Sequence, residues 1–205
     1  MVEGDIKIAD VARRYAGITG VSGLAIDLAR PDGSEDAIIT LFDKIEAAAA
    51  PEIIIVNLPA GASSTVDAQA EILSSVAREM GYEIRVAWLL GAGEDSARLA
   101  AESALCDIAD RKIAVYNSAF GEPSRAVWMT HPARDAWLSS GGLETIMPAL
   151  ASRVMTEIRD RPGRYSTLAA PDSGLTVLSS RIIKNWLTAI AAGPASLMLD
   201  DGDTR

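Results

Sequence analysis

The sequence contains one cysteine and one histidine in 205 residues, and this scarcity excludes several kinds of site. A single thiol cannot form an internal disulfide, and it fits a reducing cytosol. One cysteine and one histidine also cannot build a thiolate or imidazole metal cluster. Cys106 lies in an apolar helical pattern and is expected to be a buried, inert thiol. His131 precedes a proline, and no G-x-S-x-G motif is present, so a serine-hydrolase triad is not predicted.

Basic residues and long apolar runs are also scarce. Lys and Arg number 19 against 28 Asp and Glu, which gives a formal net charge of −9. Direct nucleic-acid binding is therefore not expected, because it requires clustered cations that neutralise phosphates. No uninterrupted apolar run approaches the ~20 residues of a membrane span, and the N-terminus lacks the layout of a signal peptide. We expect a soluble, cytoplasmic chain that does not bind membranes.

Apolar residues make up 49% of the sequence and alternate between two periodicities. Strands are expected at residues 21–28, 53–56, 83–90 and 112–117, and helices at 6–16, 34–50, 64–80 and 96–109. Strands that alternate with helices form parallel sheets through right-handed crossovers. The pattern predicts a three-layer α/β/α fold with a mainly parallel sheet, in a single domain over residues 1–205.

The pattern is less regular after residue 120. We expect a short strand or sheet edge at 125–129, a helix at 134–140 and a strand at 144–147. Pro148 would then stand in the first turn of a helix that reaches residue 159. A terminal helix is expected at 175–192, and a frayed tail from residue 194 to residue 205. Trp128, Trp137 and Trp186 occupy amphipathic positions typical of core residues.

The strand at 53–56 is the centre of the predicted architecture. Its four consecutive β-branched residues are typical of a strand buried on both faces of a parallel sheet. Ligands in such sheets bind beyond the carboxyl ends of the strands. Asn57, Pro59 and Gly61 follow this strand and are therefore candidate binding residues, although a cap of the following turn is the favoured role for Asn57.

Three motifs together resemble the ParA/MinD-like P-loop ATPases: Val2-Glu-Gly-Asp5, the stretch from Ile53 to Gly61, and Val115-Tyr-Asn117. They are similar, in order, to the acidic end of that group's second strand, its Walker B strand and turn, and its adenine-contacting strand end. Residues 146–150 and the helix around Trp186 resemble plasmid stability and mobilisation members. The resemblance implies a P-loop NTPase-like fold, ATP and Mg²⁺ as cofactors, and a homodimer or protein partner. It also implies cofactor-binding roles for a specific set of residues: Asp5, Asn57, Pro59, Gly61 and Asn117. Asn117 is interpreted more readily as a cap of the following turn than as a contact to a base.

The sequence departs from this family at two positions that matter for catalysis. No G-x-x-x-x-G-K-[ST] motif is present, and Asn57 stands where the family carries an aspartate. A neutral amide binds a hard dication more weakly than a carboxylate does. If residues 2–5 are the end of the family's second strand, the first strand and its P-loop are missing, and an exposed sheet edge with self-association is expected. These departures argue against ATPase activity by this chain alone, and we assign no catalytic residue and no metal ligand.

Two alternatives to a nucleotide-binding protein remain open. The same fold could serve as a non-catalytic protein-interaction module. A Rossmann-like small-molecule enzyme is the other, based on the turn Gly91-Ala-Gly-Glu-Asp-Ser96. In that turn Ser96 replaces the third glycine, and Glu94 and Asp95 would repel a pyrophosphate. The two acidic residues are therefore better interpreted as the first turn of a helix. The turn at residues 60–65 could contact phosphate through backbone N–H groups or could simply cap a helix.

Overall fold

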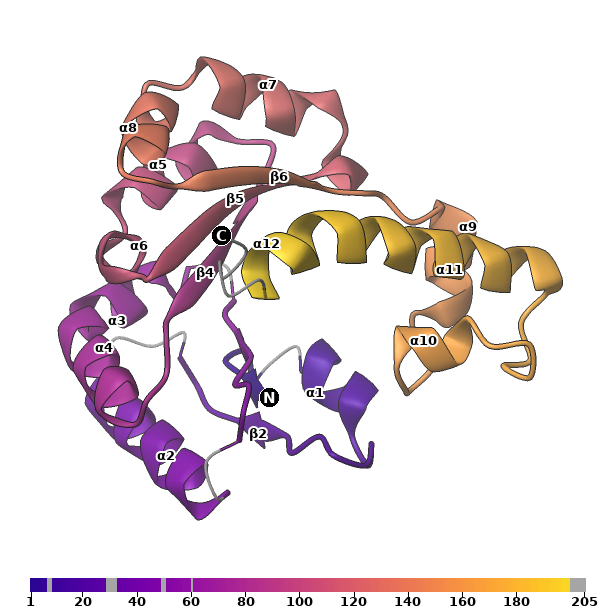
Figure 1. Cartoon of the computed structure of the whole chain (residues 1–205), viewed down its shortest axis with the longest axis horizontal. Coiled ribbons are helices and arrows are strands. Elements are labelled where there is room, and N and C mark those ends of the chain that lie inside the picture. Colours follow the sequence, from indigo (N-terminus) through magenta and orange to yellow (C-terminus); the bar gives the residue numbers. More distant parts are fainter. Residues whose placement is uncertain (7–8, 29–32, 49–50, 60, 200–205) are drawn as a thin grey trace, which may run out of the picture. The chain divides into compact units, whose positions relative to one another are not determined.

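The computed structural model describes residues 1–6, 9–28, 33–48, 51–59 and 61–199, and the chain divides into two compact units. The first unit consists of Met1–Val76 and Asp160–Arg164. The second consists of Ala77–Arg159 and Tyr165–Arg205. Each contains a three-stranded parallel sheet, so the protein is mixed α/β with two small parallel sheets (Figure 1).

The sheet of the first unit has the order β2-β1-β3, with every pair parallel. Its strands are short: β1 (Val2–Glu3), β2 (Leu24–Ala25) and β3 (Val56–Asn57). The helices that accompany it are α1 (Asp10–Tyr15), α2 (Ser34–Ala47) and α3 (Ser63–Ala68), followed by α4 (Ala70–Glu79), whose last three residues belong to the second unit.

Helix α2 supplies much of the apolar core of the first unit. Ile38, Leu41 and Ile45 recur at helical spacing and are each no more than 6% exposed. Ile26 and Leu28, which follow β2, are buried as well. A helix was expected at 34–50, and α2 lies within this range.

The sheet of the second unit has the order β4-β5-β6, again with every pair parallel. Its strands are β4 (Arg85–Leu90), β5 (Arg111–Asn117) and β6 (Leu143–Met147). The central strand β5 carries an almost continuous run of buried residues, and Ile113 and Ala114 are 0% exposed. This agrees with a strand covered on both faces.

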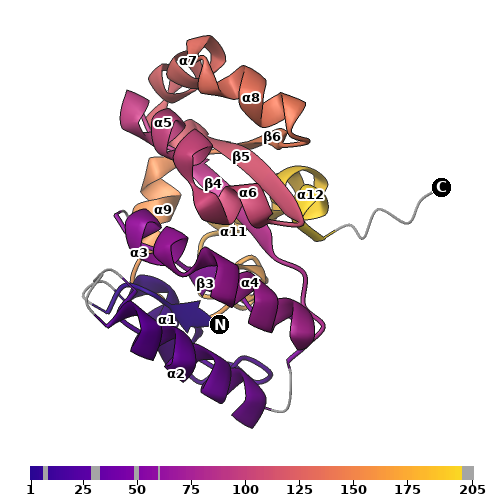
Figure 2. The same cartoon turned by 90° about the vertical axis from the view of Figure 1, so that its left-hand side faces the viewer.

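Helices cover both faces of this second sheet (Figures 1 and 2). One face packs against helices that follow β4 and β5: α5 (Glu94–Glu102), α7 (Glu122–Thr130) and α8 (Ala133–Ser139), with α6 (Ala104–Ile108) leading into β5. Trp128 and Trp137 lie in this core with ring centroids 5.9 Å apart in an edge-to-face arrangement. Cys106 is buried in the same cluster, as expected.

The other face contacts the end of a long C-terminal helical stretch. It comprises α11 (Val177–Ile190), the π-helical turn η2 (Ala191–Ala195) and α12 (Ser196–Leu199), and α11 packs on α9 (Ser152–Ile158) and α10 (Tyr165–Leu168). Arg85 and Arg111 donate to the carbonyls of Met198 and Leu197 at 2.8 and 2.7 Å. Cations are favourable at a helix C-terminus. The expectation that the tail frays from residue 194 is therefore wrong up to residue 199, and residues 200–205 lie outside the described residues.

The stretch Val177–Leu199 is long and apolar enough, by length and composition, to cross a membrane, and 11% of its apolar 18-residue segment is buried. A single helix of this kind is weak evidence for a membrane span, because some helices of soluble proteins have the same length and composition. The chain is not clearly a membrane protein.

Three predictions about individual elements are wrong. Residues 125–129 belong to helix α7 rather than to a strand. Pro148 precedes α9, which begins at Ser152, and its carbonyl accepts a hydrogen bond from Trp186 Nε1 at 2.7 Å. The segment at 53–56 is not buried on both faces, because Ile53 and Ile55 are 57% and 60% exposed.

Candidate functional site

A cavity of about 240 Å³ lies in the second unit at the carboxyl ends of β5 and β6. This is where parallel α/β sheets bind ligands. Side chains and backbone from β5, the following turn, α7 and β6 line it: Tyr116, Ser118, Gly121, Glu122, Arg125 and Ile146. The cavity therefore combines an aromatic wall, an apolar wall, a hydroxyl, a carboxylate and a guanidinium.

A tight turn after β5 shapes one side of the cavity. Asn117 ends the strand, and its side-chain oxygen accepts a hydrogen bond from the Ala119 N–H at 3.0 Å, which starts the short helix η1 (Ser118–Phe120). Gly121 then adopts a φ of +72°, a region that favours glycine, and α7 begins at the next residue. The turn brings Ser118 and the first turn of α7 to the same opening.

The cavity has two charged lining residues, Arg125 and Glu122. Within the described part of the chain, neither Arg125 nor Glu122 forms an ion pair, although they stand three residues apart on α7. Both are exposed. A guanidinium binds carboxylate or phosphate groups, and a carboxylate accepts hydrogen bonds from hydroxyl groups. The cavity can therefore hold a ligand that carries both an anionic group and hydroxyl groups.

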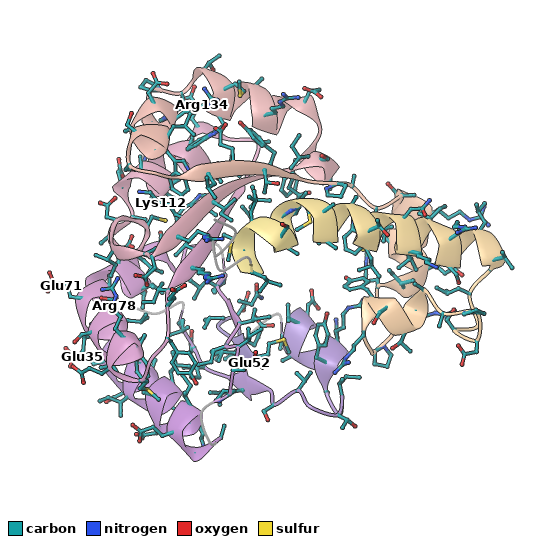
Figure 3. All side chains as sticks on the ribbon, in the orientation of Figure 1. Glu35, Glu52, Glu71, Arg78, Lys112 and Arg134 are labelled. Carbon is teal, nitrogen blue, oxygen red and sulfur yellow. The ribbon has the colours of Figure 1, made fainter. Side chains whose placement is uncertain are left out.

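A polar network inside the unit holds Tyr116, which forms one wall of the cavity. Glu144 on β6 accepts hydrogen bonds from Arg134 of α8 at 2.8 and 3.0 Å and from Trp128 Nε1 at 2.5 Å. Figure 3 shows Arg134 among the helices over this sheet. The Tyr116 hydroxyl lies 3.5 Å from the same carboxylate and 3.2 Å from Met129 Sδ. These contacts connect β5, β6, α7 and α8 behind the cavity.

Burial and charge set the pKa values in this network. Burial raises the pKa of the Glu144 carboxyl, but the hydrogen bonds from Arg134 and Trp128 outweigh burial, and the net pKa is lowered. Burial, with a smaller contribution from the Glu144 charge, raises the pKa of the Tyr116 hydroxyl. The hydrogen bond to Glu144 raises the pKa of Arg134. At neutral pH the network is therefore a carboxylate paired with a guanidinium beside a neutral phenol.

The other four predicted site residues lie in the first unit. Asp5 follows β1, and Asn57 ends β3, whose register pairs it with Glu3. The structure thus places Asp5 and Asn57 at the ends of neighbouring strands. Pro59 and Gly61 follow in the turn before α3, where Gly61 has a φ of +93° and the Ala62 N–H donates to the Pro59 carbonyl.

Asn57 forms a hydrogen bond within the first unit to Glu3, which was not predicted as a site residue. Its amide nitrogen donates to the Glu3 carboxylate at 2.7 Å, and Glu3 is 0% exposed. The backbone N–H groups of Val11 and Ala12, at the start of α1, donate to the same carboxylate at 3.1 and 3.3 Å. Gly4 fits closely here, because a Cβ on it would lie 2.8 Å from the Asn57 carbonyl oxygen.

These residues do not fit a bound Mg²⁺ ion. The Glu3 carboxylate faces N–H donors and is inaccessible to solvent, and Asn57 directs its amide nitrogen, not a ligating oxygen, toward it. In the part of the chain that the structure describes, no group of three or more His, Cys, Asp or Glu residues could hold a metal ion.

The turn from Gly91 to Ser96, which follows β4, is closed by a hydrogen bond between its own residues. The Ser96 hydroxyl accepts a hydrogen bond from the Gly91 N–H at 3.0 Å, and Glu94 and Asp95 stand in the first turn of α5. This is the helix-start arrangement that the sequence favoured over a dinucleotide site. His131, at the end of α7, is half-buried, and its Nδ1 accepts from the Ala133 N–H at 3.1 Å.

Comparison of the chain with protein-family models, with curated proteins and with solved structures gives no match. The site must therefore be interpreted from its own geometry.

Proposed function

We propose that the protein binds an adenine nucleotide, as a relative of the ParA/MinD-like ATPases of plasmid maintenance or mobilisation. The observation that carries the proposal is the cavity at the carboxyl end of β5, the strand that ends at Asn117. Tyr116 and Ser118, the chain neighbours of Asn117, line this cavity, whereas the Asn117 side chain caps the following turn. In the family that the sequence resembles, the asparagine at the equivalent strand end contacts adenine. The parallel sheets of both units are compatible with this origin.

The cavity has the size and chemistry for one part of a nucleotide. Sites for whole drug-sized ligands usually measure about 300–1,000 Å³, and this one measures about 240 Å³. Ile146, which is 47% exposed, offers an apolar surface for a flat base, Glu122 can accept hydrogen bonds from ribose hydroxyls, and Arg125 can pair with phosphate. A nucleoside portion would occupy the cavity, and its phosphates would extend into solvent near α7.

Binding without efficient hydrolysis is the expected activity. Phosphoryl transfer depends on a phosphate-cradling loop, a lysine and a metal that neutralise charge in the transition state. The sequence has no P-loop motif, and the residues around Asn57 do not fit Mg²⁺. We therefore expect the affinity for ATP to change little when Mg²⁺ is removed.

Calorimetric titration of the 205-residue chain with ATP, with and without Mg²⁺, tests the proposal. We expect micromolar binding, and about a tenfold loss of affinity in Arg125→Gln, because the variant loses a charge-assisted contact to phosphate. Arg153→Gln is the matched control, since Arg153 is also exposed in the second unit but does not line the cavity. An absence of heat with ATP, or equal losses in both variants, would contradict the proposal.

A non-catalytic interaction module is the second candidate, and one observation favours it. The segment at residues 53–58 exposes four large apolar side chains: Ile53, Ile55, Val56 and Leu58. Exposed apolar surface of this kind is typical of protein-binding sites. The two functions are compatible, since a nucleotide-binding protein can also dock a partner.

A further inference from the structure

The cavity at the carboxyl ends of β5 and β6 has one positive and one negative residue among the lining residues that the structure describes. Arg125 and Glu122 both belong to α7. They stand three residues apart, and side chains at this spacing are neighbours on one face of a helix, with Cβ atoms about 5–6 Å apart. A phosphate that pairs with Arg125 therefore lies close to the carboxylate of Glu122.

The turn that leads into α7 uses its backbone N–H groups internally. The Ala119 N–H donates to the Asn117 side-chain oxygen at 3.0 Å, and the Gly121 N–H donates to the Ser118 carbonyl at 3.1 Å. Pro123, in the first turn of α7, has no N–H. These three positions therefore offer no spare N–H group to a phosphate.

Sites for polyphosphates are built differently. They surround the phosphates with successive backbone N–H groups and add a lysine and a metal ion that neutralise charge. In this cavity the first phosphate of a nucleotide gains the guanidinium of Arg125. Each further phosphate gains no equivalent partner among the described lining residues. It also brings negative charge near Glu122 and onto a chain whose net charge is −9.

We propose that the cavity recognises a nucleoside monophosphate, so that AMP binds at least as tightly as ADP and ATP. This inference rests on the proposed adenine-nucleotide site and specifies which phosphate the site binds. The phosphate attached to the ribose pairs with Arg125, while Glu122 accepts hydrogen bonds from ribose hydroxyls and disfavours further phosphates. The site thus responds to the monophosphate form of a nucleotide, whereas a P-loop holds the triphosphate.

Two differences in affinity follow from this assignment. AMP should bind about tenfold more tightly than adenosine, because it adds charge-assisted hydrogen bonds to a guanidinium. AMP should also bind about threefold more tightly than ATP at low ionic strength, because unit charges about 8 Å apart repel each other weakly in water. Added salt should reduce the second difference, since it screens exposed charges.

Calorimetric titration with adenosine, AMP, ADP and ATP, in EDTA and at about 20 mM ionic strength, tests the proposal. EDTA removes Mg²⁺, which would otherwise bind the phosphates and neutralise part of the charge on ATP. We expect AMP to bind most tightly, followed by ADP and ATP, with adenosine weakest. In Arg125→Gln, AMP should bind no more tightly than adenosine.

Glu122→Gln separates the charge of this side chain from its hydrogen bonding. The glutamine oxygen can still accept from ribose hydroxyls, but the negative charge is removed. The ratio of the AMP affinity to the ATP affinity should therefore fall from about three to about one. Glu102→Gln is the matched control, because Glu102 is 56% exposed on α5 of the same unit and does not line the cavity.

The wild-type affinities distinguish this inference from the proposed function. ATP that binds more than about threefold tighter than AMP would overturn the monophosphate assignment and leave the proposed nucleotide site standing. Adenosine as tight as AMP, an unchanged ratio in Glu122→Gln, or an equal change in Glu102→Gln would do the same. An absence of heat with all four ligands would overturn the proposed function and this inference with it. Far-UV circular dichroism of each variant checks that it is folded.

Discussion

Glu144 accepts hydrogen bonds from several side chains of the second unit. Its side chain is 19% exposed, and it accepts hydrogen bonds from both Arg134 and Trp128. A carboxylate this enclosed is favourable only while its donors remain in place. The sequence contained a signal for it, namely an acidic residue within the predicted strand 144–147. Its donors on α7 and α8 could not be identified, because helix–sheet packing decides which side chains reach it.

Glu144→Gln is expected to lower the free energy of unfolding by about 2 kcal/mol at pH 7, because hydrogen bonds to a charged group are the stronger ones. The pKa of Glu144 is lowered in the folded protein from its ordinary value of 4.5, so the carboxylate stabilises the fold above about pH 4.5. This contribution is lost as the pH falls below 4.5 and through the lower folded-state pKa. The difference in the free energy of unfolding between wild type and Glu144→Gln should therefore become smaller in acid.

Urea unfolding followed by tryptophan fluorescence at pH 7 and at pH 3.5 measures this difference. Glu102→Gln is the control, because Glu102 is 56% exposed and pairs with Arg98 on the surface of α5, where ion pairs contribute little. A Glu144→Gln effect that is small at pH 7, or that does not diminish in acid, would contradict the expected role of the carboxylate.

The residues around Asn57 illustrate a limit of strand patterns. The sequence correctly placed Asn57 directly after the apolar run, but it gave no indication that Glu3 would take the amide as its hydrogen-bond partner. That partnership depends on β1 lying beside β3, and no local pattern encodes which strands are neighbours. The apolar run at 53–56 was wrongly expected to be buried on both faces, since an apolar sequence does not determine which elements cover it.

At the scale of elements, the long amphipathic pieces were predictable and α7 was not. Helices α2 and α11 and strands β4, β5 and β6 lie close to their predicted positions, because each has a sustained periodicity. Residues 125–129 were interpreted as a strand because Val127, Trp128 and Met129 form a short apolar run. The helix signal was the preceding Gly121 and the proline at position 123 in the first turn of α7.

The turn before α7 is expected to require glycine at position 121. An alanine at a φ of +72° is strained, so Gly121→Ala should lower the free energy of unfolding by about 1 kcal/mol or more. Gly91→Ala is the control, because its new Cβ would meet the Ser96 side chain at an ordinary 3.7 Å and its φ is not in the left-handed region. Thermal unfolding of the two variants measures this effect, and equal losses of stability would show that the conformation at residue 121 is not the cause.

At the scale of the whole molecule, the two units differ in what stabilises them. The first sheet has strands of two residues each, whereas β4, β5 and β6 have six, seven and five. The second unit also contains the cluster built around Trp128 and Trp137, while the apolar core of the first unit is mainly aliphatic. Longer strands and larger buried aromatic side chains favour a more stable second unit.

We therefore expect the two units to unfold in separate steps, the first unit at lower denaturant concentration. All four tryptophans, Trp88, Trp128, Trp137 and Trp186, belong to the second unit, so fluorescence reports on that unit alone. Far-UV circular dichroism reports on the helices of both units, including α2. In a guanidinium titration the circular dichroism should begin to change before the fluorescence does, because probes of a two-state transition coincide and probes of separate transitions do not. Superimposable curves with one midpoint would show that the two units unfold as one cooperative structure, and the difference in strand length would then not govern stability.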